Sequence, residues 1–328
     1  MPTYTIIKIK ENMNLEKVVE RIKERGCFEH TPDDPKWPKN EKLFAKWIPL
    51  EEEPMITKFE TGIGTNEEVV QASVEIQRPR QVWTDSQKKL LPLEKRINIT
   101  QTDVIFFENG GSCYVAVQGS ARSQQVNRTK RDLLEPSELI DWEEGKRTES
   151  VGLPSEYRID PDMFYWLYYL YLEKKGEIPS NPPMRILELS GYRGTSLEDT
   201  QYYKSRGDRV AKLLPTLAFL YGNDDLKSLR FTLNTNSEQI ELELHHDGSF
   251  ELVSYAGKYA SVEANYKEAA QLLLVYKDII PRLKDAYEND KDKRNWNENV
   301  RDQFNANIGR IIIERIKETL PSLEETGS

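Results

Sequence analysis

The sequence predicts an α+β protein, with a β-rich N-terminal domain that contains a hairpin and a C-terminal domain with a small antiparallel meander and long helices. Alternating apolar and polar residues, separated by turn signals, recur through the first 150 residues. Three more such runs lie close together between residues 229 and 255, whereas apolar residues recur at helical spacing from residue 262 onward. Because strands and helices do not alternate regularly, a doubly wound parallel sheet is not expected.

Local patterns predict the elements of the N-terminal domain, residues 1–150. Alternation predicts strands at residues 3–10 and 68–77. Asn14 is suited to cap a helix over residues 15–25. We expect the proline- and charge-rich residues 30–54 to form a loop that packs on the body of the domain.

The hairpin is the clearest local signal of the first domain. Apolar runs at residues 103–108 and 113–118 are joined by Asn109-Gly110-Gly111-Ser112. Such a turn needs residues that accept a positive φ, and the Asn-Gly step supplies them. A polar helix is predicted to follow over residues 123–134.

The C-terminal domain, residues 151–328, opens with a well-defined helix start. Asp160 is a good N-cap and Pro161 suits the first helical position, so a helix is predicted over residues 163–175. That helix is apolar nearly all round and is expected to be buried. The remaining predicted elements are a strand at 184–189, a helix at 208–221, a meander at 229–235, 239–246 and 250–255, a helix at 262–289 bent at Pro281, and an amphipathic helix at 296–320.

Charge and composition limit the class of protein. The chain has 328 residues and a net charge of −9, which argues against a protein that coats nucleic acid with its whole surface. Cys27 and Cys113 lie far apart, as in proteins of a reducing compartment. The N-terminus shows no apolar signal segment and no apolar run approaches the length of a membrane span. We therefore expect a cytoplasmic protein with no membrane partner. Its size and composition resemble those of accessory proteins of bacterial defence or mobile-element systems.

No pattern in the sequence predicts catalysis or cofactor binding. The chain has three histidines, and His245 and His246 are neighbours that point to opposite faces of a predicted strand. Zinc sites need three or four convergent ligands, so no metal site is expected. The glycines within residues 185–194 lack the spacing of a cofactor-binding loop, and we expect a tight turn after a strand there. Cys113 lies in a predicted strand, where packing is its expected role.

A local reversal of charge is the main functional signal. Residues 78–131 contain ten basic and four acidic residues, a net charge of +6 in a chain of −9. Arginines beside small polar side chains suit phosphate contact, because the guanidinium donates in a fork. A solvated helix face, or a patch docked on the acidic remainder, is the ordinary alternative. Six residues are predicted to bind nucleic acid or a protein partner: Arg78, Arg80, Arg122, Arg128, Lys130 and Arg131.

These observations favour a non-enzymatic accessory protein that binds DNA, RNA or another protein. The final amphipathic helix is expected to pack within the monomer, with a homodimer through the C-terminal helices as the second interpretation. One alternative is a divergent, magnesium-dependent nuclease whose acids are Glu67, Glu68, Glu75 and Asp103. The other is a structural subunit of a larger assembly.

Overall fold

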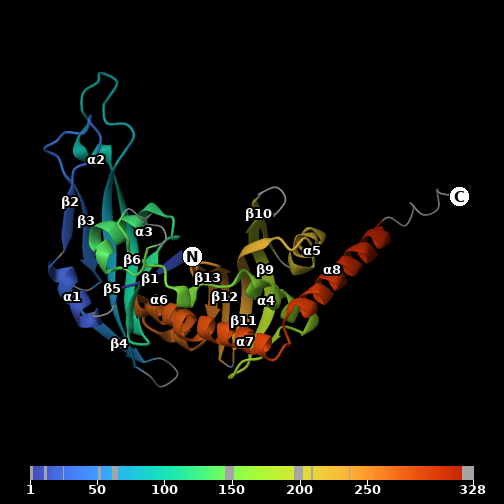
Figure 1. The fold of residues 1–328 in the computed structure, drawn as a ribbon. Coiled ribbons are helices and arrows are strands. Elements are labelled where there is room, and N and C mark those ends of the chain that lie inside the picture. The colour runs from blue at the N-terminus through green and yellow to red at the C-terminus, as the bar shows by residue number, and fades with distance from the viewer. Residues whose placement is uncertain are drawn as a thin grey trace. The chain divides into compact units, whose positions relative to one another are not determined.

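The fold is α+β (Figure 1). A computed structural model describes residues 3–10, 13–24, 26–50, 53–60, 66–144, 151–195, 202–207, 210–235 and 237–319. The chain divides into two compact units. The N-terminal unit comprises Pro2–Glu156 with Ala264–Ala270, and the C-terminal unit comprises Tyr157–Glu263 with Gln271–Ser328.

The N-terminal unit contains an antiparallel sheet in the order β1-β7-β6-β5-β3-β2, and β4 also pairs with β5. The strands are β1 (Thr3–Lys8), β2 (Cys27–His30), β3 (Leu43–Pro49), β4 (Ile56–Glu60), β5 (Asn66–Pro79), β6 (Ile97–Asn109) and β7 (Ser112–Gln118). The strands predicted near residues 3–10, 68–77, 103–108 and 113–118 are therefore confirmed.

One face of this sheet carries the core of the unit, because alternate residues of each strand point to the same side. Along β5 this face presents Val70, Ala72, Val74 and Ile76. The helices that cover it are α1 (Leu15–Glu24) and α3 (Gln124–Arg128), the latter followed by a π-helical turn, Thr129–Leu133. They contribute the buried side chains Leu15, Val18, Ile22, Val126 and Leu133, each worth roughly 1.5–3 kcal/mol when fully buried. A four-residue helix, α2 (Leu93–Arg96), precedes β6.

The predicted hairpin between β6 and β7 is confirmed, and its turn explains the glycines. Asn109 pairs with Ser112, so Gly110 and Gly111 are the two central residues. Their φ values are 58° and 75°, in the left-handed region that two-residue hairpin turns of this hand require.

The expectation of a loop over residues 30–54 is wrong in its second half, where β3 pairs with both β2 and β5. Leu43, Ala45 and Trp47 are buried, and the residues between them are more exposed. This short alternation is surrounded by prolines and charges, which obscured it in the sequence. Trp47 packs against Phe106 of β6 with ring centroids 5.7 Å apart.

The strands of the C-terminal unit pair antiparallel, in the order β10-β9-β11-β12-β13, and β8 also pairs with β9. Its strands are β8 (Glu177–Ile178), β9 (Met184–Thr195), β10 (Tyr202–Arg206), β11 (Asp225–Thr235), β12 (Glu238–His245) and β13 (Phe250–Ala256). The predicted meander is confirmed as β11, β12 and β13.

The tight turn expected within residues 185–194 is wrong, because β9 continues through both glycines to Thr195. A Cβ on Gly194 would lie 2.1 Å from the ring of Phe219. The glycine therefore makes room for an aromatic ring that packs on the strand, and it is not required by a turn.

The helices of the C-terminal part follow the sequence signals closely. They are α4 (Pro161–Glu173), α5 (Leu214–Tyr221), α6 (Ala264–Leu273), α7 (Ile280–Asp292) and α8 (Glu298–Thr319). The Asp160 side chain accepts a hydrogen bond from the backbone of Asp162 and caps α4, as predicted. Among the described residues, no helix is both long and apolar enough to cross a membrane.

Two of the predicted helices are divided differently, and proline explains both cases. The helix expected at 208–221 is a 3₁₀ turn, Val210–Lys212, followed by α5, with Pro215 in the first turn of α5. The single bent helix expected at 262–289 is α6, a π-helical turn Leu274–Ile279, and α7, with Pro281 in the first turn of α7. Proline lacks a backbone donor and is tolerated in the first turn of a helix, where none is needed.

Candidate functional site

Three of the six predicted basic residues come together at one pocket of the N-terminal unit. Arg78 lies near the end of β5, Arg128 ends α3, and Arg131 lies in the π-helical turn that follows. The pocket has a volume of about 670 Å³. Its other lining residues come from the end of β2 and beyond, the end of β5 and beyond, and α3: His30, Thr31, Pro32, Asp33, Asp34, Pro79, Trp83, Gln124 and Asn127. We call it the arginine pocket.

The helix α3 supplies one wall of the arginine pocket. Its N-cap is Ser123, whose hydroxyl accepts a hydrogen bond from the backbone of Val126 at 3.2 Å. Residues three and four apart share a helix face, which places Gln124, Asn127 and Arg128 on the pocket side. Val126 points into the core instead, so the register of α3 decides which polar groups reach the pocket.

Arg78 is a partly buried guanidinium that forms no ion pair with a carboxylate of the described residues. It donates to the Gln124 side chain and, at 3.1 Å, to the Thr100 hydroxyl, both of which are neutral. Its Nε is buried without a hydrogen-bond partner. Burial, and then the nearby charge of Arg128, lower the pKa of Arg78 below its usual value. Within the described part of the chain, no carboxylate therefore lies within ion-pair distance of this charge.

Arg128 and Arg131 share a single carboxylate, that of Asp132. Arg128 donates to Asp132 Oδ2 at 3.0 Å, and Arg131 Nε donates to Asp132 Oδ1 at 2.7 Å. The Asp132 side chain is 1 % exposed, whereas those of Arg128 and Arg131 are 18 % and 55 % exposed. Two cations on one carboxylate leave a further positive charge at the pocket, which adds to that of Arg78.

His30 completes the basic wall and is held neutral. Its Nε2 lies 3.1 Å from Arg128 Nη2. A guanidinium only donates, so Nε2 accepts and the imidazole proton sits on Nδ1. That Nδ1 is buried without a hydrogen-bond partner. Burial first, and then the charge of Arg128, lower the pKa of His30.

The other three predicted residues do not line this pocket. Lys130 is 1 % exposed and its ammonium donates to the carbonyl of Val151 at 2.7 Å. The prediction that Lys130 offers its charge at the surface is therefore wrong, because the π-helical turn directs this side chain into the interior. Arg80 donates through Nε to the carbonyl of Ile97 at 2.7 Å, and Arg122 is exposed before α3.

Two acidic residues also line the arginine pocket and reduce its net charge. Asp33 and Asp34 follow β2, and both are exposed. Water screens exposed charges strongly, so these carboxylates offset the pocket charge less than their number suggests. The half-buried guanidinium of Arg78 is screened less.

The acids considered for a nuclease lie along two neighbouring strands, with Glu67, Glu68 and Glu75 on β5 and Asp103 on β6. Glu67 and Glu75 are eight residues apart in one strand, which corresponds to roughly 26 Å. Glu75 forms an ion pair with Lys46 at 3.4 Å. Within the described ranges, no group of three or more histidine, cysteine, aspartate or glutamate side chains is arranged to hold a metal ion.

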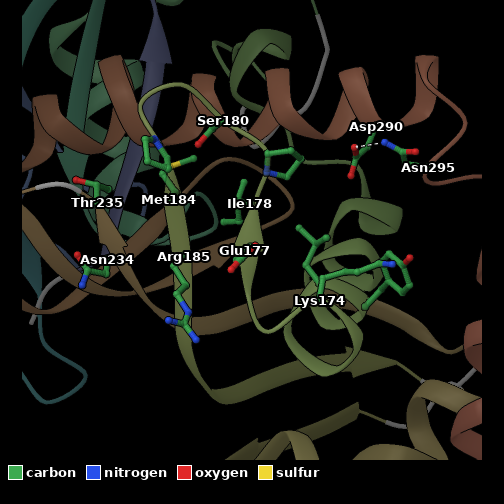
Figure 2. A pocket seen from close by; sticks show the side chains of 14 residues that line it. Lys174, Glu177, Ile178, Ser180, Met184, Arg185, Asn234, Thr235, Asp290 and Asn295 are labelled. Atoms are coloured by element: carbon green, nitrogen blue, oxygen red, sulfur yellow. Dashed lines mark hydrogen bonds between the residues drawn. The ribbon is translucent and has the colours of Figure 1, made fainter.

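The C-terminal unit has a pocket of its own, with a volume of about 880 Å³ (Figure 2). Its lining mixes apolar and polar side chains from α4, the residues that follow it, β9, β11 and α7: Tyr169, Leu170, Lys174, Glu177, Ile178, Pro179, Ser180, Pro183, Met184, Arg185, Asn234, Thr235, Asp290 and Asn295. We call it the aspartate pocket, after its one buried charged side chain.

Asp290 of α7 is 5 % exposed, and each hydrogen-bond partner that its carboxylate has among the described residues is neutral. Trp166 Nε1 donates to Oδ2 at 3.0 Å and Asn295 Nδ2 donates to Oδ1 at 3.1 Å. Figure 2 shows the second of these bonds at one side of the pocket. Three further charged side chains line the pocket, and all are exposed: Lys174, Glu177 and Arg185.

Some residues of the arginine pocket were detectable from the sequence and others were not. Gln124, Asn127 and Arg128 follow helical spacing, so their shared face was a usable signal. His30 carries no local signal, since it lies 98 positions from Arg128 in the chain. Trp83 lies five positions after Arg78, but no local pattern indicated that its ring lines the same pocket.

Cysteine chemistry adds no second candidate within the described residues. Cys27 is exposed and Cys113 is buried, and neither forms a disulfide. Burial raises the pKa of the Cys113 thiol to about 12, so this group stays protonated and unreactive at neutral pH.

Comparison with known proteins gives no relative on which to base a function. No protein-family model matches the chain. No curated protein matches it in sequence either. The assignment of function therefore depends on the chemistry of the two pockets.

Proposed function

We propose that this protein is a non-enzymatic binding protein whose N-terminal unit binds single-stranded nucleic acid through the arginine pocket. One observation carries the proposal, namely that Arg78 is a partly buried guanidinium with only neutral hydrogen-bond partners beside the Arg128 guanidinium. Burying a charge without a counter-charge is unfavourable. A phosphate would supply that counter-charge and accept two hydrogen bonds from each of two forks.

The other lining residues favour a nucleotide over an isolated phosphate. Trp83 lines the same pocket and packs edge-on against Trp37, with ring centroids 5.2 Å apart. An aromatic ring beside arginines is the usual means of stacking an unpaired base while its phosphate is bound. Gln124 and Asn127 add side-chain amides, which donate and accept hydrogen bonds.

The size of the pocket favours a single strand. About 670 Å³ is the volume of a small-molecule site. A duplex would instead need a broad positive surface, and the chain as a whole is acidic, with a net charge of −9. We place this activity in the cytoplasm, the reducing compartment that the cysteine usage favours.

Binding of an acidic protein segment is the second candidate, since carboxylates also pair with forked guanidinium groups. Trp83 discriminates between the two, because base stacking involves this ring and carboxylate binding does not. Replacing Trp83 by leucine should weaken nucleic-acid binding by roughly tenfold, since stacking is worth about 1–3 kcal/mol per base.

The experiment is fluorescence anisotropy with short labelled single- and double-stranded DNA and RNA at about 50 and 200 mM salt. The double variant Arg78→Gln/Arg131→Gln should bind single strands at least about tenfold more weakly, and its salt slope should fall by roughly 1.4. The matched control, Lys95→Gln/Arg122→Gln, removes the same charge from exposed positions outside the pocket. An equal loss of affinity in the two double variants would show that only the net charge of the protein matters. That result would contradict the assignment of the site to the pocket.

A further inference from the structure

The aspartate pocket contains a buried negative charge with no cationic partner. Asp290 accepts hydrogen bonds from Trp166 and Asn295, and within the described ranges no ammonium or guanidinium lies within ion-pair distance of its carboxylate. A carboxylate has about four lone-pair sites, and two are occupied here. Because an unpaired buried carboxylate is costly, this group favours a ligand that brings a positive charge.

The walls of the pocket suit an organic cation more than a metal ion. Calcium and magnesium take several oxygen ligands at once, and Asp290 is the only buried acid that lines this pocket. The lining is instead rich in apolar side chains: Tyr169, Leu170, Ile178, Pro179, Pro183 and Met184. An ammonium group on a hydrocarbon stem would meet the carboxylate with its charged end and these side chains with its stem.

Tyr169 already interacts with an ammonium group, that of Lys174, whose Nζ lies 5.5 Å from the ring centroid. This contact indicates that the ring face accepts a cation. Because the Lys174 side chain is exposed, a ligand could displace it at little cost. Lys174 therefore adds a positive charge at the edge of the pocket that repels an incoming ammonium group.

The exposed cations also limit the charge of the ligand. Lys174 and Arg185 both line the pocket, and they would repel a second positive charge on the ligand. A volume of about 880 Å³ is within the range of small-molecule sites. The best occupant is thus a single ammonium group on an apolar stem.

We propose that the aspartate pocket binds a monoamine with an apolar chain, with its ammonium group on Asp290 and its stem against Ile178 and Met184. The ammonium can belong to a free alkylamine or to a lysine side chain of a peptide, and the two sources share the same chemistry. This site lies within the C-terminal unit, so the proposal does not depend on nucleic-acid binding by the N-terminal unit.

The test is isothermal titration calorimetry of the full chain with hexylamine, with its neutral analogue hexanol, and with the diamine 1,6-diaminohexane. We expect binding of hexylamine, no binding of hexanol and weaker binding of the diamine. Titration with a lysine whose amino and carboxyl termini are blocked distinguishes a peptide source from a free amine. Equal binding of hexylamine and hexanol would overturn the proposal, because the charge would then be irrelevant.

Three variants locate the charge that matters. Asp290→Asn keeps the shape of the side chain and should weaken hexylamine binding at least about tenfold. Asp292→Asn removes an exposed carboxylate of the same helix from outside the pocket and should change the affinity less than twofold. Lys174→Gln removes a repelling positive charge and should strengthen binding about threefold. If Asp290→Asn does not fold, by circular dichroism, the Lys174→Gln result decides: unchanged or weaker binding overturns the proposal.

Discussion

The arginine pocket and the aspartate pocket differ in the sign of their central charge but share one arrangement of hydrogen-bond partners. Each has a buried or half-buried charged group, Arg78 in one and Asp290 in the other, whose hydrogen-bond partners are all neutral. They differ in what surrounds that group. Arg78 lies among other cations, whereas Asp290 lies among apolar and aromatic side chains.

Three other carboxylates in the C-terminal unit that are buried or partly buried have cationic partners, in contrast to Asp290. On the C-terminal sheet, Glu243 pairs with Arg193 at 2.6 Å, and Glu241 pairs with Arg230 at 2.6 Å. Ser228 also donates to Glu243 at 3.0 Å. Glu238, which is 4 % exposed, is paired with an ammonium instead, that of Lys258 at 3.7 Å. An unbalanced buried charge therefore points to a ligand, because a group kept at a cost to stability is typical of functional sites.

The largest expected change in the free energy of unfolding comes from removing the carboxylate partner of a buried cation. Asp132→Ala leaves Arg128 largely buried without a carboxylate and should lower the free energy of unfolding of the N-terminal unit by about 3 kcal/mol, since removing one partner of a buried ion pair costs that much. Asp33→Ala, an exposed acid at the same pocket, should change it by less than about 0.5 kcal/mol. Urea unfolding followed by circular dichroism measures both. Similar losses in both variants would mean that burial does not set the importance of these charges.

Removing a buried charge that has no counter-charge should raise the free energy of unfolding, whereas Asp132→Ala should lower it. Arg78→Gln and Asp290→Asn each eliminate a desolvated charge without leaving an opposite charge unpaired. Both variants should therefore unfold at or above the wild-type temperature, with the free energy of unfolding raised by up to about 1 kcal/mol. Both should also lose ligand binding. Differential scanning fluorimetry of the free proteins checks this. A clear loss of stability in either variant would show that its charge stabilises the fold. The charge in that pocket would then not be one that is kept for a ligand.

Acidification should affect the arginine pocket through His30. Its pKa is lowered in the folded protein by burial and by Arg128, so the unfolded chain takes up a proton first as the pH falls below about 6.5. The neutral imidazole thus contributes stability that is present above pH 6.5 and is lost as the pH falls toward the folded pKa. His30→Gln should reduce this pH dependence, measured as the difference in urea unfolding between pH 7.5 and 5.5. The pKa of His245, in the other unit, is also lowered by burial. If His30→Gln leaves the pH dependence of stability unchanged, that dependence should be attributed to His245.

The smallest effect should be the difference in salt sensitivity between the two pockets. Inorganic phosphate is expected to bind to partly exposed guanidinium groups such as Arg131, and its affinity should fall about threefold between roughly 50 and 200 mM salt. Hexylamine is expected to bind to the nearly buried Asp290, and its affinity should fall less than twofold. Calorimetry at both salt concentrations gives the comparison. Equal salt dependence would show that both charges are equally accessible to ions.

The sequence predicted most of the elements, because the signals that define them are local. The Asp160 cap of α4, the glycines of the β6–β7 turn and the alternation of β5 all act over a few residues, within reach of sequence reasoning. It failed where a local signal had two interpretations. The alternation of β3 is short and is surrounded by prolines and charged residues, so it did not stand out as a strand. The glycines of β9 indicated a turn, whereas Gly194 in fact makes room for the ring of Phe219.

The sequence by itself determined that residues 78–131 are rich in positive charge, and only the tertiary structure decided which of those charges line a pocket. Lys130 and Arg131 are neighbours in the chain, yet one is 1 % exposed and the other lines a pocket. The structure also brings His30 to Arg128 across 98 positions and Trp166 to Asp290 across 124. The physical reason is that pairing and burial depend on long-range contacts. The sequence alone does not show whether a charged residue has an oppositely charged partner in the fold or lines a pocket without one.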